Sequence, residues 1–328
     1  MTPVRLAAIA LLASTFFAGL GCSKVPTPSQ MSELNRELLQ TVDHHDVSAA
    51  RRLLDRGADI ETKGYNGKTA LGLAASNHDL AIVKLLLQKG AHVHAKDRSG
   101  VTPLMSAAHG GYADIAQLLL KETSDVAEKN EALLEAVTGG PAVVMIADPQ
   151  KDHAASASEY QASISAAASP WVRTVQLLLD SGADLEATDQ YRGTPLIDAA
   201  AHAQTDIVVL LLDRGANIKA KNNRGETALI AASCECALAT MNSAYDVVRV
   251  LVEKGADVNA RSDEGTTPLM SAAMGFGDSS ILKLLLDHGA EPTARDTHSN
   301  TALKLAMEEH RPDKVLLLKK ALANPHKR

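Results

Sequence analysis

A six-residue phrase that ends in Gly-Ala recurs along this 328-residue chain at a nearly constant interval. Its usual form is Leu-Leu-Asp-Arg-Gly-Ala or a close variant, and its glycines are Gly57, Gly90, Gly182, Gly215, Gly255 and Gly289. The first two glycines are 33 residues apart, and the last four follow one another after 33, 40 and 34 residues. A period of this length indicates a stack of repeated structural units, each packed against its neighbours.

A second phrase, Thr-Pro-Leu or Thr-Ala-Leu, keeps step with the first and predicts the start of a helix in each unit. Its copies begin at Thr69, Thr102, Thr194, Thr227, Thr267 and Thr301. Threonine caps the free amides of a helix start, and proline at the first helical position gives up a donor that has no partner there. The Gly of the Gly-Ala phrase predicts the end of a second helix, because the residue after a helix often has a left-handed conformation.

The order helix, turn, helix, Gly-Ala-Asp, hairpin and Thr-Pro-Leu resembles the ankyrin repeat, and the resemblance extends over residues 33–323. It implies an all-α repeat solenoid, an array of about eight helix-turn-helix units joined by β-hairpin loops, that binds other proteins. The His that commonly follows Thr-Pro-Leu in the family is absent here. No nucleophile, metal-hydrolase or dinucleotide-binding motif is found in the sequence, so we expect neither enzyme activity nor a cofactor.

The N-terminal segment does not fit the repeat and has the features of an export signal. Arg5 precedes an apolar run, and small residues lead up to Cys22. This junction resembles the lipobox of bacterial lipoproteins, in which such a cysteine is lipidated; cleavage to a soluble chain is the alternative. The sequence thus predicts a signal peptide (1–21), a lipid-anchor cysteine and tether (22–32), the array (33–323) and a basic tail (324–328). We expect a periplasmic protein anchored by lipid to the outer membrane.

The charge balance bears on the class of partner. The chain has a formal net charge of −6 at pH 7. A net-acidic chain is unsuited to general nucleic-acid binding, which depends on cations that neutralise phosphates. We therefore expect a protein partner, no nucleic acid, and an array that is monomeric by itself.

The period fails between Gly90 and Gly182, which are 92 residues apart. Thr123 stands where the repeat has glycine, so this turn is expected to be strained or to close differently. A shortened hairpin is expected at Asn130, and an insertion rich in Ala and Ser at 139–170, within the fourth unit. Insertions in repeat proteins map to loops on one face, which is often the binding face.

Two groups of potential metal or redox residues occur in the array. Cys234 and Cys236 would point to different sides of a helix, which favours free thiols, with a strained local disulfide as the alternative. His92 and His94 could lie on one side of an extended segment, but the motif offers no third ligand, so no metal is expected. A metal- or redox-handling envelope protein is the alternative function that these residues leave open.

The surface left for a partner comprises the hairpin tips and the exposed ends of the first helices. Tyrosine and arginine are enriched among residues that dominate binding energy. The candidate partner-binding residues are Tyr65, Lys96, Arg98, His109, Tyr191, Arg192, Arg224, Met274 and Phe276. The irregular segment should notch this surface between Arg98 and Tyr191. The partner is not identified by the sequence, and a secreted effector that binds host proteins is a further alternative.

Overall fold

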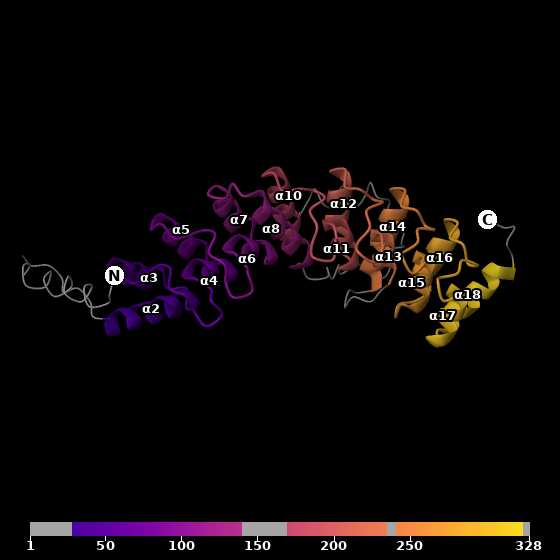
Figure 1. Cartoon of the computed structure of the whole chain (residues 1–328), viewed down its shortest axis with the longest axis horizontal. Coiled ribbons are helices and arrows are strands. Elements are labelled where there is room, and N and C mark those ends of the chain that lie inside the picture. The colour runs from indigo at the N-terminus through magenta and orange to yellow at the C-terminus, as the bar shows by residue number, and fades with distance from the viewer. Residues whose placement is uncertain (1–27, 140–168, 235–240, 324–328) are drawn as a thin grey trace, which may run out of the picture.

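The computed structural model describes residues 28–139, 169–234 and 241–323, which form an elongated, arched stack of helices (Figure 1). The predicted signal peptide, Cys22, most of the 139–170 insertion and the basic tail lie outside the described residues. Within the described ranges the chain is all-helical apart from its loops, as the repeat pattern predicts. No helix in these ranges is long and apolar enough to cross a membrane.

The helices of the described ranges follow one another in pairs, each with a first and a second helix that pack together. The first helices stack on one another along one row and the second helices along another. The pairs are α2 (Pro28–Asp43) with α3 (Val47–Asp55), α4 (Ala70–Ser76) with α5 (Leu80–Gln88), α6 (Pro103–His109) with α7 (Ala113–Leu120), α8 (Val126–Gly139) with α10 (Pro170–Asp180), α11 (Pro195–Ala201) with α12 (Thr205–Asp213), α13 (Ala228–Ser233) with α14 (Met241–Glu253), α15 (Pro268–Met274) with α16 (Ser280–Asp287), and α17 (Ala302–Glu308) with α18 (Pro312–Ala323).

Helix starts and ends follow the two recurring phrases. The Thr69 hydroxyl accepts a hydrogen bond from the amide of Gly72, and Thr194 caps α11 in the same way. Gly57 and Gly90 lie just beyond α3 and α5 with φ of 94° and 84°. A Cβ at either glycine would meet no atom within 4 Å. Glycine is therefore required there for its backbone conformation, since space is not limiting.

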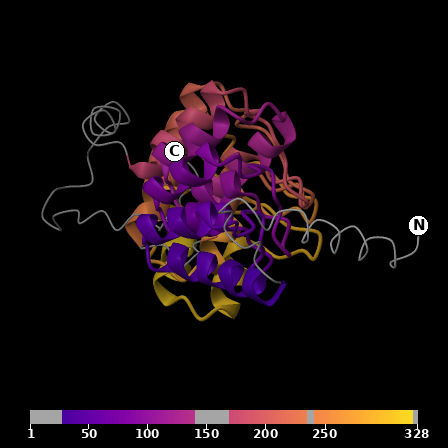
Figure 2. The ribbon, with the colours of Figure 1, turned by 90° about the vertical axis from the view of Figure 1, so that its left-hand side faces the viewer.

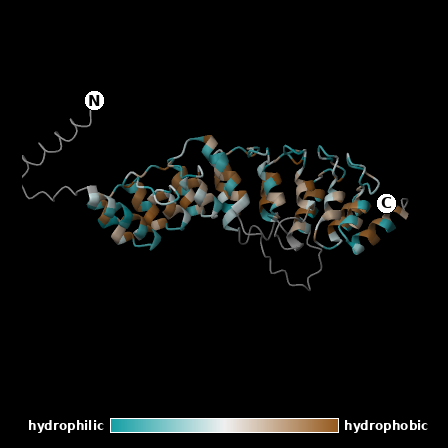
Figure 3. Cartoon of the chain, turned by 60° about the horizontal axis from the view of Figure 1, so that its bottom comes forward, coloured by the Kyte–Doolittle hydropathy of each residue, from teal (hydrophilic) through white to brown (hydrophobic). Residues whose placement is uncertain are grey.

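The core is one continuous apolar layer between the helices, built chiefly from alanine, leucine and valine. Small residues of the first helices, such as Ala107 and Ala199, are fully buried and allow neighbouring helices to approach closely. Leu86 and Leu211, from the second helices α5 and α12, are also fully buried. Apolar residues lie between the helices and hydrophilic loops lie along one edge (Figure 3). Each unit thus depends on its neighbours to cover its apolar face.

Six hairpin loops connect successive pairs and project on one side of the stack (Figure 2). Each has a four-residue tip in which the fourth amide donates to the first carbonyl. The tips are 64–67, 97–100, 189–192, 222–225, 262–265 and 296–299. Lys63 and Thr69 form an isolated antiparallel bridge, and the described loops otherwise keep their hairpin shape without regular strands.

The fourth pair has no hairpin loop before it, and the prediction of a shortened hairpin at Asn130 is wrong. α8 begins at Val126, so Asn130 lies inside a helix of 14 residues. The segment from Val126 to Leu133 has neither Gly nor Pro to make a turn, and Asp125 accepts a hydrogen bond from the amide of Ala127 at 2.9 Å. The first helix of the fourth pair therefore extends through the place where the other units have a hairpin.

The long helix α8 resembles α2, which begins the whole stack and likewise has no hairpin loop before it in the described residues. α2 starts at Pro28, earlier than the predicted array boundary at residue 33. The side-chain oxygen of Asn35 accepts from the amide of Asp59 at 2.8 Å, and that of Asn130 accepts from the amide of Asp184 at 2.7 Å. Each asparagine thus ties its helix, α2 or α8, to the loop that follows the second helix of the same pair. In these two features the fourth unit resembles the first unit of the array.

The last pair contains a buried cation that the sequence pattern does not reveal. Lys314 of α18 is fully buried. Its ammonium donates to the carbonyl oxygens of Ala272 at 2.8 Å and Gly275 at 3.0 Å, at the end of α15. The side chain therefore satisfies carbonyls that a helix end leaves without intrahelical partners.

Candidate functional site

Tyr65 and Arg98 form an exposed pair on the first two hairpin tips. Tyr65 is 90% exposed, and the guanidinium carbon of Arg98 lies 5.8 Å from the centre of its ring. The amide of Arg98 also donates to the carbonyl oxygen of Asn66, at 3.1 Å. Neighbouring tips thus hold an aromatic face and a planar cation close together, and both are available to a partner.

The next group of candidate residues lies beyond α8, on the tips at 189–192 and 222–225. Tyr191 is 58% exposed, and Arg192 and Arg224 are exposed beside it along the row. Arg192 has a φ of 60°, a left-handed conformation that is uncommon for a residue with a side chain. The amide of Asn223 donates to the carbonyl oxygen of Tyr191 at 2.8 Å. This bond fixes the two tips side by side.

His109, Met274 and Phe276 do not lie on the tips. Each is at or just beyond the end of a seven-residue first helix, α6 or α15, and the hairpin precedes the start of that helix. A helix of this length separates its ends by about 10 Å. The Nδ1 atom of His109 lies 3.1 Å from Glu135, and Phe276 lies under the guanidinium of Arg311 at 4.8 Å. The predicted surface therefore divides into a row of tips and a separate set of helix ends.

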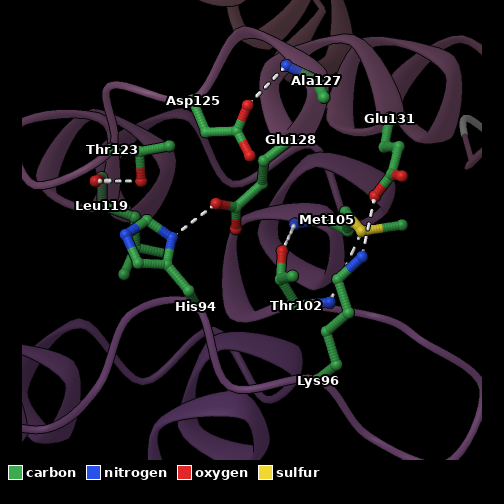
Figure 4. A network of polar contacts seen from close by, with 10 residues as sticks. All are labelled: His94, Lys96, Thr102, Met105, Leu119, Thr123, Asp125, Ala127, Glu128 and Glu131. Atoms are coloured by element: carbon green, nitrogen blue, oxygen red, sulfur yellow. Dashed lines mark hydrogen bonds and ion pairs between the residues drawn. The ribbon is translucent and has the colours of Figure 1, made fainter.

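Between Arg98 and Tyr191, the start of α8 lies against the base of the hairpin loop at 91–102 (Figure 4). Nδ1 of His94 is 2.6 Å from Oε2 of Glu128, whose side chain is buried. The other carboxylate oxygen of Glu128 is buried without a hydrogen-bond partner in the part of the chain described. Lys96, one of the candidate residues, pairs with Glu131 at 3.6 Å. These contacts fix the hairpinless helix in place, and sequence reasoning missed Glu128.

A pocket of about 610 Å³ lies beside this junction, lined in part by His92, His94 and Glu122. Both histidines line this pocket, although the segment is a turn at Val93 and His94 and not the extended segment that the sequence suggested. Among the residues that the structure describes, no three His, Cys, Asp or Glu side chains converge as metal ligands. The described geometry gives the two histidines no third ligand.

Thr123 is not in the left-handed conformation that alignment with the repeat glycines indicates, so of the two expected alternatives the strained turn is wrong and the different closure is confirmed. The turn closes differently. The amide of Glu122 donates to the carbonyl oxygen of Leu119, and the buried hydroxyl of Thr123 donates to the same oxygen at 3.0 Å. Figure 4 shows this bond beside the His94 and Glu128 pair.

Replacing Thr123 with glycine is therefore expected to destabilise the protein by about 1–2 kcal/mol, through a lost hydrogen bond and a more flexible unfolded chain. Urea unfolding of the variant measures the change. Ser124→Gly is the matched control, because Ser124 is an exposed neighbour and adds only the flexibility. An increase in stability for Thr123→Gly would show that the turn is strained after all.

Asp198 is a second residue that the sequence pattern does not single out. Burial, followed by the nearby Asp189 carboxylate, raises the pKa of Asp198 to about 6. A Cβ at Gly193 would lie 2.7 Å from one Asp198 carboxylate oxygen and 3.2 Å from one of Asp189. Glycine at position 193 thus leaves room for the carboxyl group of Asp189, in the tip, and that of Asp198, in α11. Asp198, on α11 next to this tip, therefore changes its charge near pH 6.

Cys234 takes part in a disulfide, so the expectation of free thiols is wrong for this residue. Its partner lies outside the described residues. The expectation rested on a continuous helix, but α13 ends at Ser233 and Cys234 is the residue after it.

Comparison with known proteins identifies the repeat. A family model described as ankyrin repeats matches three segments, residues 38–130, 163–262 and 236–328, which together span most of the chain. No curated protein matches the sequence. The matched segments contain the stacked helix pairs, the hairpin loops and the recurring phrases described above. The chain belongs to the ankyrin-repeat family, whose stacked units serve protein–protein interaction.

Proposed function

We propose that this ankyrin-repeat protein is an exported, lipid-anchored scaffold that binds another protein through the tips of its hairpin loops. The observation that carries the proposal is the row of exposed aromatic and basic residues on rigidly linked tips, with Tyr65 and Arg98 on one side of α8 and Tyr191 and Arg192 on the other. Such residues gain most when a partner buries them, and the backbone bonds between tips reduce the ordering cost of binding.

The proposed location rests on the sequence before residue 28 and on one structural feature. The apolar run and the small residues before Cys22 support export and lipidation. The disulfide of Cys234 supports an oxidising compartment, because thiols are kept reduced in the cytosol. A lipid anchor would hold the binding row near a membrane surface and raise the local concentration of a partner there.

Arg98→Ala and Tyr191→Ala are each expected to weaken partner binding by about 1–2 kcal/mol without changing the fold. Affinity capture from the envelope fraction of the native cell, repeated with each variant, identifies partner proteins and measures their loss. The control is Lys84→Ala, since Lys84 is exposed on the second helix α5. Arg249 looks like an equivalent control by sequence, but its side chain is buried against Asp246 at 3.0 Å, so it is unsuitable. Binding that depends on Lys84 and not on the tips would contradict the proposed site.

Cys22→Ala is expected to move the protein from the membrane fraction to the soluble fraction, or to block its processing, because the acylated thiol is removed. Fractionation followed by mass measurement of the N-terminal peptide reports both outcomes. Ser23→Ala keeps the thiol and serves as the control. A Cys22→Ala protein that stays in the membrane fraction with normal processing would exclude the lipid anchor.

A further inference from the structure

An aspartate side chain holds the turn of the tip that carries Tyr191 and Arg192. Oδ1 of Asp189, the first residue of this tip, accepts hydrogen bonds from the amides of Tyr191 at 2.8 Å and Gly193 at 2.6 Å. Such a bond to the backbone two residues ahead stabilises a turn. The carbonyl oxygen of Tyr191 in turn accepts from the amide of Asn223, so the same turn supports the link to the next tip. The conformation of the tip therefore depends on the Asp189 carboxylate.

The tip at 97–100 is held in the same way and provides a comparison within the protein. Oδ1 of Asp97 accepts from the amides of Ser99 at 2.8 Å and Val101 at 3.0 Å. What distinguishes the tip at 189–192 is the pair of residues that follow it, Gly193 and Asp198. The other loops have a side chain at the place of Gly193, namely Lys68, Val101, Glu226, Thr266 and Asn300. The other first helices have an uncharged residue at the place of Asp198, namely Leu73, Ser106, Ala231, Ser271 and Leu305.

Gly193 and Asp198 together place a second carboxyl group beside the one that holds the turn. A Cβ at Gly193 would lie 2.7 Å from Oδ1 of Asp198 and 3.2 Å from Oδ1 of Asp189. The two oxygens are therefore no farther apart than the sum of these distances, about 5.9 Å. Gly193 is buried and Asp198 is half-buried. The end of the tip thus partly covers the Asp198 carboxyl, which lies on the packed helix α11.

This arrangement makes the charge of Asp198 costly while the tip is closed. Burial, followed by the Asp189 carboxylate, raises the pKa of Asp198 to about 6, and His202 at the end of α11 acts in the opposite direction. The helices packed against α11 are α8, α12 and α13, and α13 has no titratable residue. The charged residues on the other two, none of which is among these causes, are Glu128, Lys129, Glu131 and Glu135 on α8 and Asp206 and Asp213 on α12.

Both causes of the raised pKa are relieved when the tip opens, because opening hydrates Asp198 and moves Asp189 away from it. The pKa of Asp198 is therefore higher in the closed tip than in the open one. By linkage, the closed tip has its full advantage in acid and loses it as the pH rises through about 6. Ionisation of Asp198 thus favours the open tip.

We propose that Asp198 makes the tip at 189–192 responsive to pH, so that the tip holds its turn while Asp198 is protonated and opens more often once Asp198 is ionised. Opening displaces Tyr191 and Arg192 and releases the bond to Asn223, so it weakens binding at the row of tips. For this last step the inference rests on the proposed function, and it adds how binding at that site is regulated.

Hydrogen exchange of the Tyr191 and Gly193 amides in the full protein, followed by NMR at about pH 5 and pH 7.5 and corrected for the intrinsic exchange rates, measures the opening. We expect protection to be about three- to tenfold lower at the higher pH. Tenfold is the limit, reached if opening returns the pKa of Asp198 to its ordinary 3.8. The Ser99 and Val101 amides are the internal control and should change little, because Ser106 stands at the place of Asp198 in their unit.

Two variants identify the group that titrates. Asp198→Asn has the shape of the protonated acid and carries no charge, so its Tyr191 and Gly193 amides should be equally protected at both pH values. His202→Gln removes the nearby imidazole and should keep the change. The proposal is overturned if the unaltered protein shows no change, if the change persists in Asp198→Asn, or if it disappears in His202→Gln.

Affinity capture from the envelope fraction at the same two pH values measures the consequence for binding. The partner is the protein lost with Arg98→Ala. Its recovery at about pH 5 relative to pH 7.5 should be about three- to tenfold higher for the unaltered protein than for Asp198→Asn. Equal ratios would overturn the regulation, and the loss in Arg98→Ala would still leave the proposed function standing. Retention of every captured protein by both Arg98→Ala and Tyr191→Ala would overturn the proposed function, and the regulation of binding with it.

Discussion

Replacing Leu211 with alanine is expected to lower the free energy of unfolding by about 2–5 kcal/mol, because it leaves a cavity in the shared apolar layer. Leu211 is fully buried on α12, and α12 packs against both α10 and α14. The cost therefore falls on interfaces between units as well as on the unit that contains the residue. Urea unfolding, followed by circular dichroism, measures the change.

Leu316→Ala is the matched control, since Leu316 is a leucine of α18 that is largely exposed. It should change the stability by less than about 0.5 kcal/mol. Equal effects of the two substitutions would mean that α12 is not packed as described. Leu86→Ala, at the equivalent place in α5, is expected to behave like Leu211→Ala.

Lys314→Met is expected to destabilise the end of the array by about 2–4 kcal/mol. Methionine fills a similar volume, but it leaves the buried carbonyl oxygens of Ala272 and Gly275 without the donor seen here. An unsatisfied buried polar group costs about 1–3 kcal/mol. Because contacts in a stack are between neighbours, the loss should be largest in the last two pairs, α15 to α18.

Hydrogen exchange resolved by peptide tests the position of this effect. Faster exchange is expected in α15 and α18 of the Lys314→Met variant, with α4 and α5 little changed. Lys319→Met is the control, because Lys319 is exposed on the same helix. Exchange rates that match those of the Lys319 variant would show that the buried ammonium contributes little to the end of the stack.

The parts of the fold that could be predicted from the sequence are those with a local cause. Thr69 begins a helix because its own hydroxyl caps it, and Gly57 follows one because its backbone needs a left-handed conformation. Such residues act on neighbours within three or four positions, so their structural effect can be predicted from the sequence alone. The stacking of the units can also be predicted, because the apolar face of each unit must be covered by a neighbouring unit.

The remaining features depend on contacts between distant residues. Glu128 and His94 are 34 positions apart, and Lys314 reaches carbonyls 39 and 42 positions away. Thr123 aligned with the repeat glycines, although its hydroxyl closes the turn in another way. The alignment gave its place in the period correctly and its conformation wrongly.

The candidate site shows the same division. Tyr65, Arg98, Tyr191 and Arg224 could be placed on tips because each lies between a Gly-Ala phrase and the next Thr phrase. His109 and Phe276 are separated from those tips by the length of a first helix. Their residue types do not reveal this separation. The hydrogen bonds between neighbouring tips, such as Asn223 to Tyr191, are formed by backbone groups, so no side chain in the sequence marks them.

Photo-crosslinking at single positions tests the account's central claim, that the partner lies on the hairpin tips. Benzoylphenylalanine is placed at position 65, on the first tip, or at position 84, on the second helix α5, and each protein is irradiated in the envelope fraction. Both positions are exposed, so both probes can react with any protein that contacts them. The account predicts a cross-linked partner from position 65 and none from position 84. A partner captured from position 84 and absent at position 65 would contradict it.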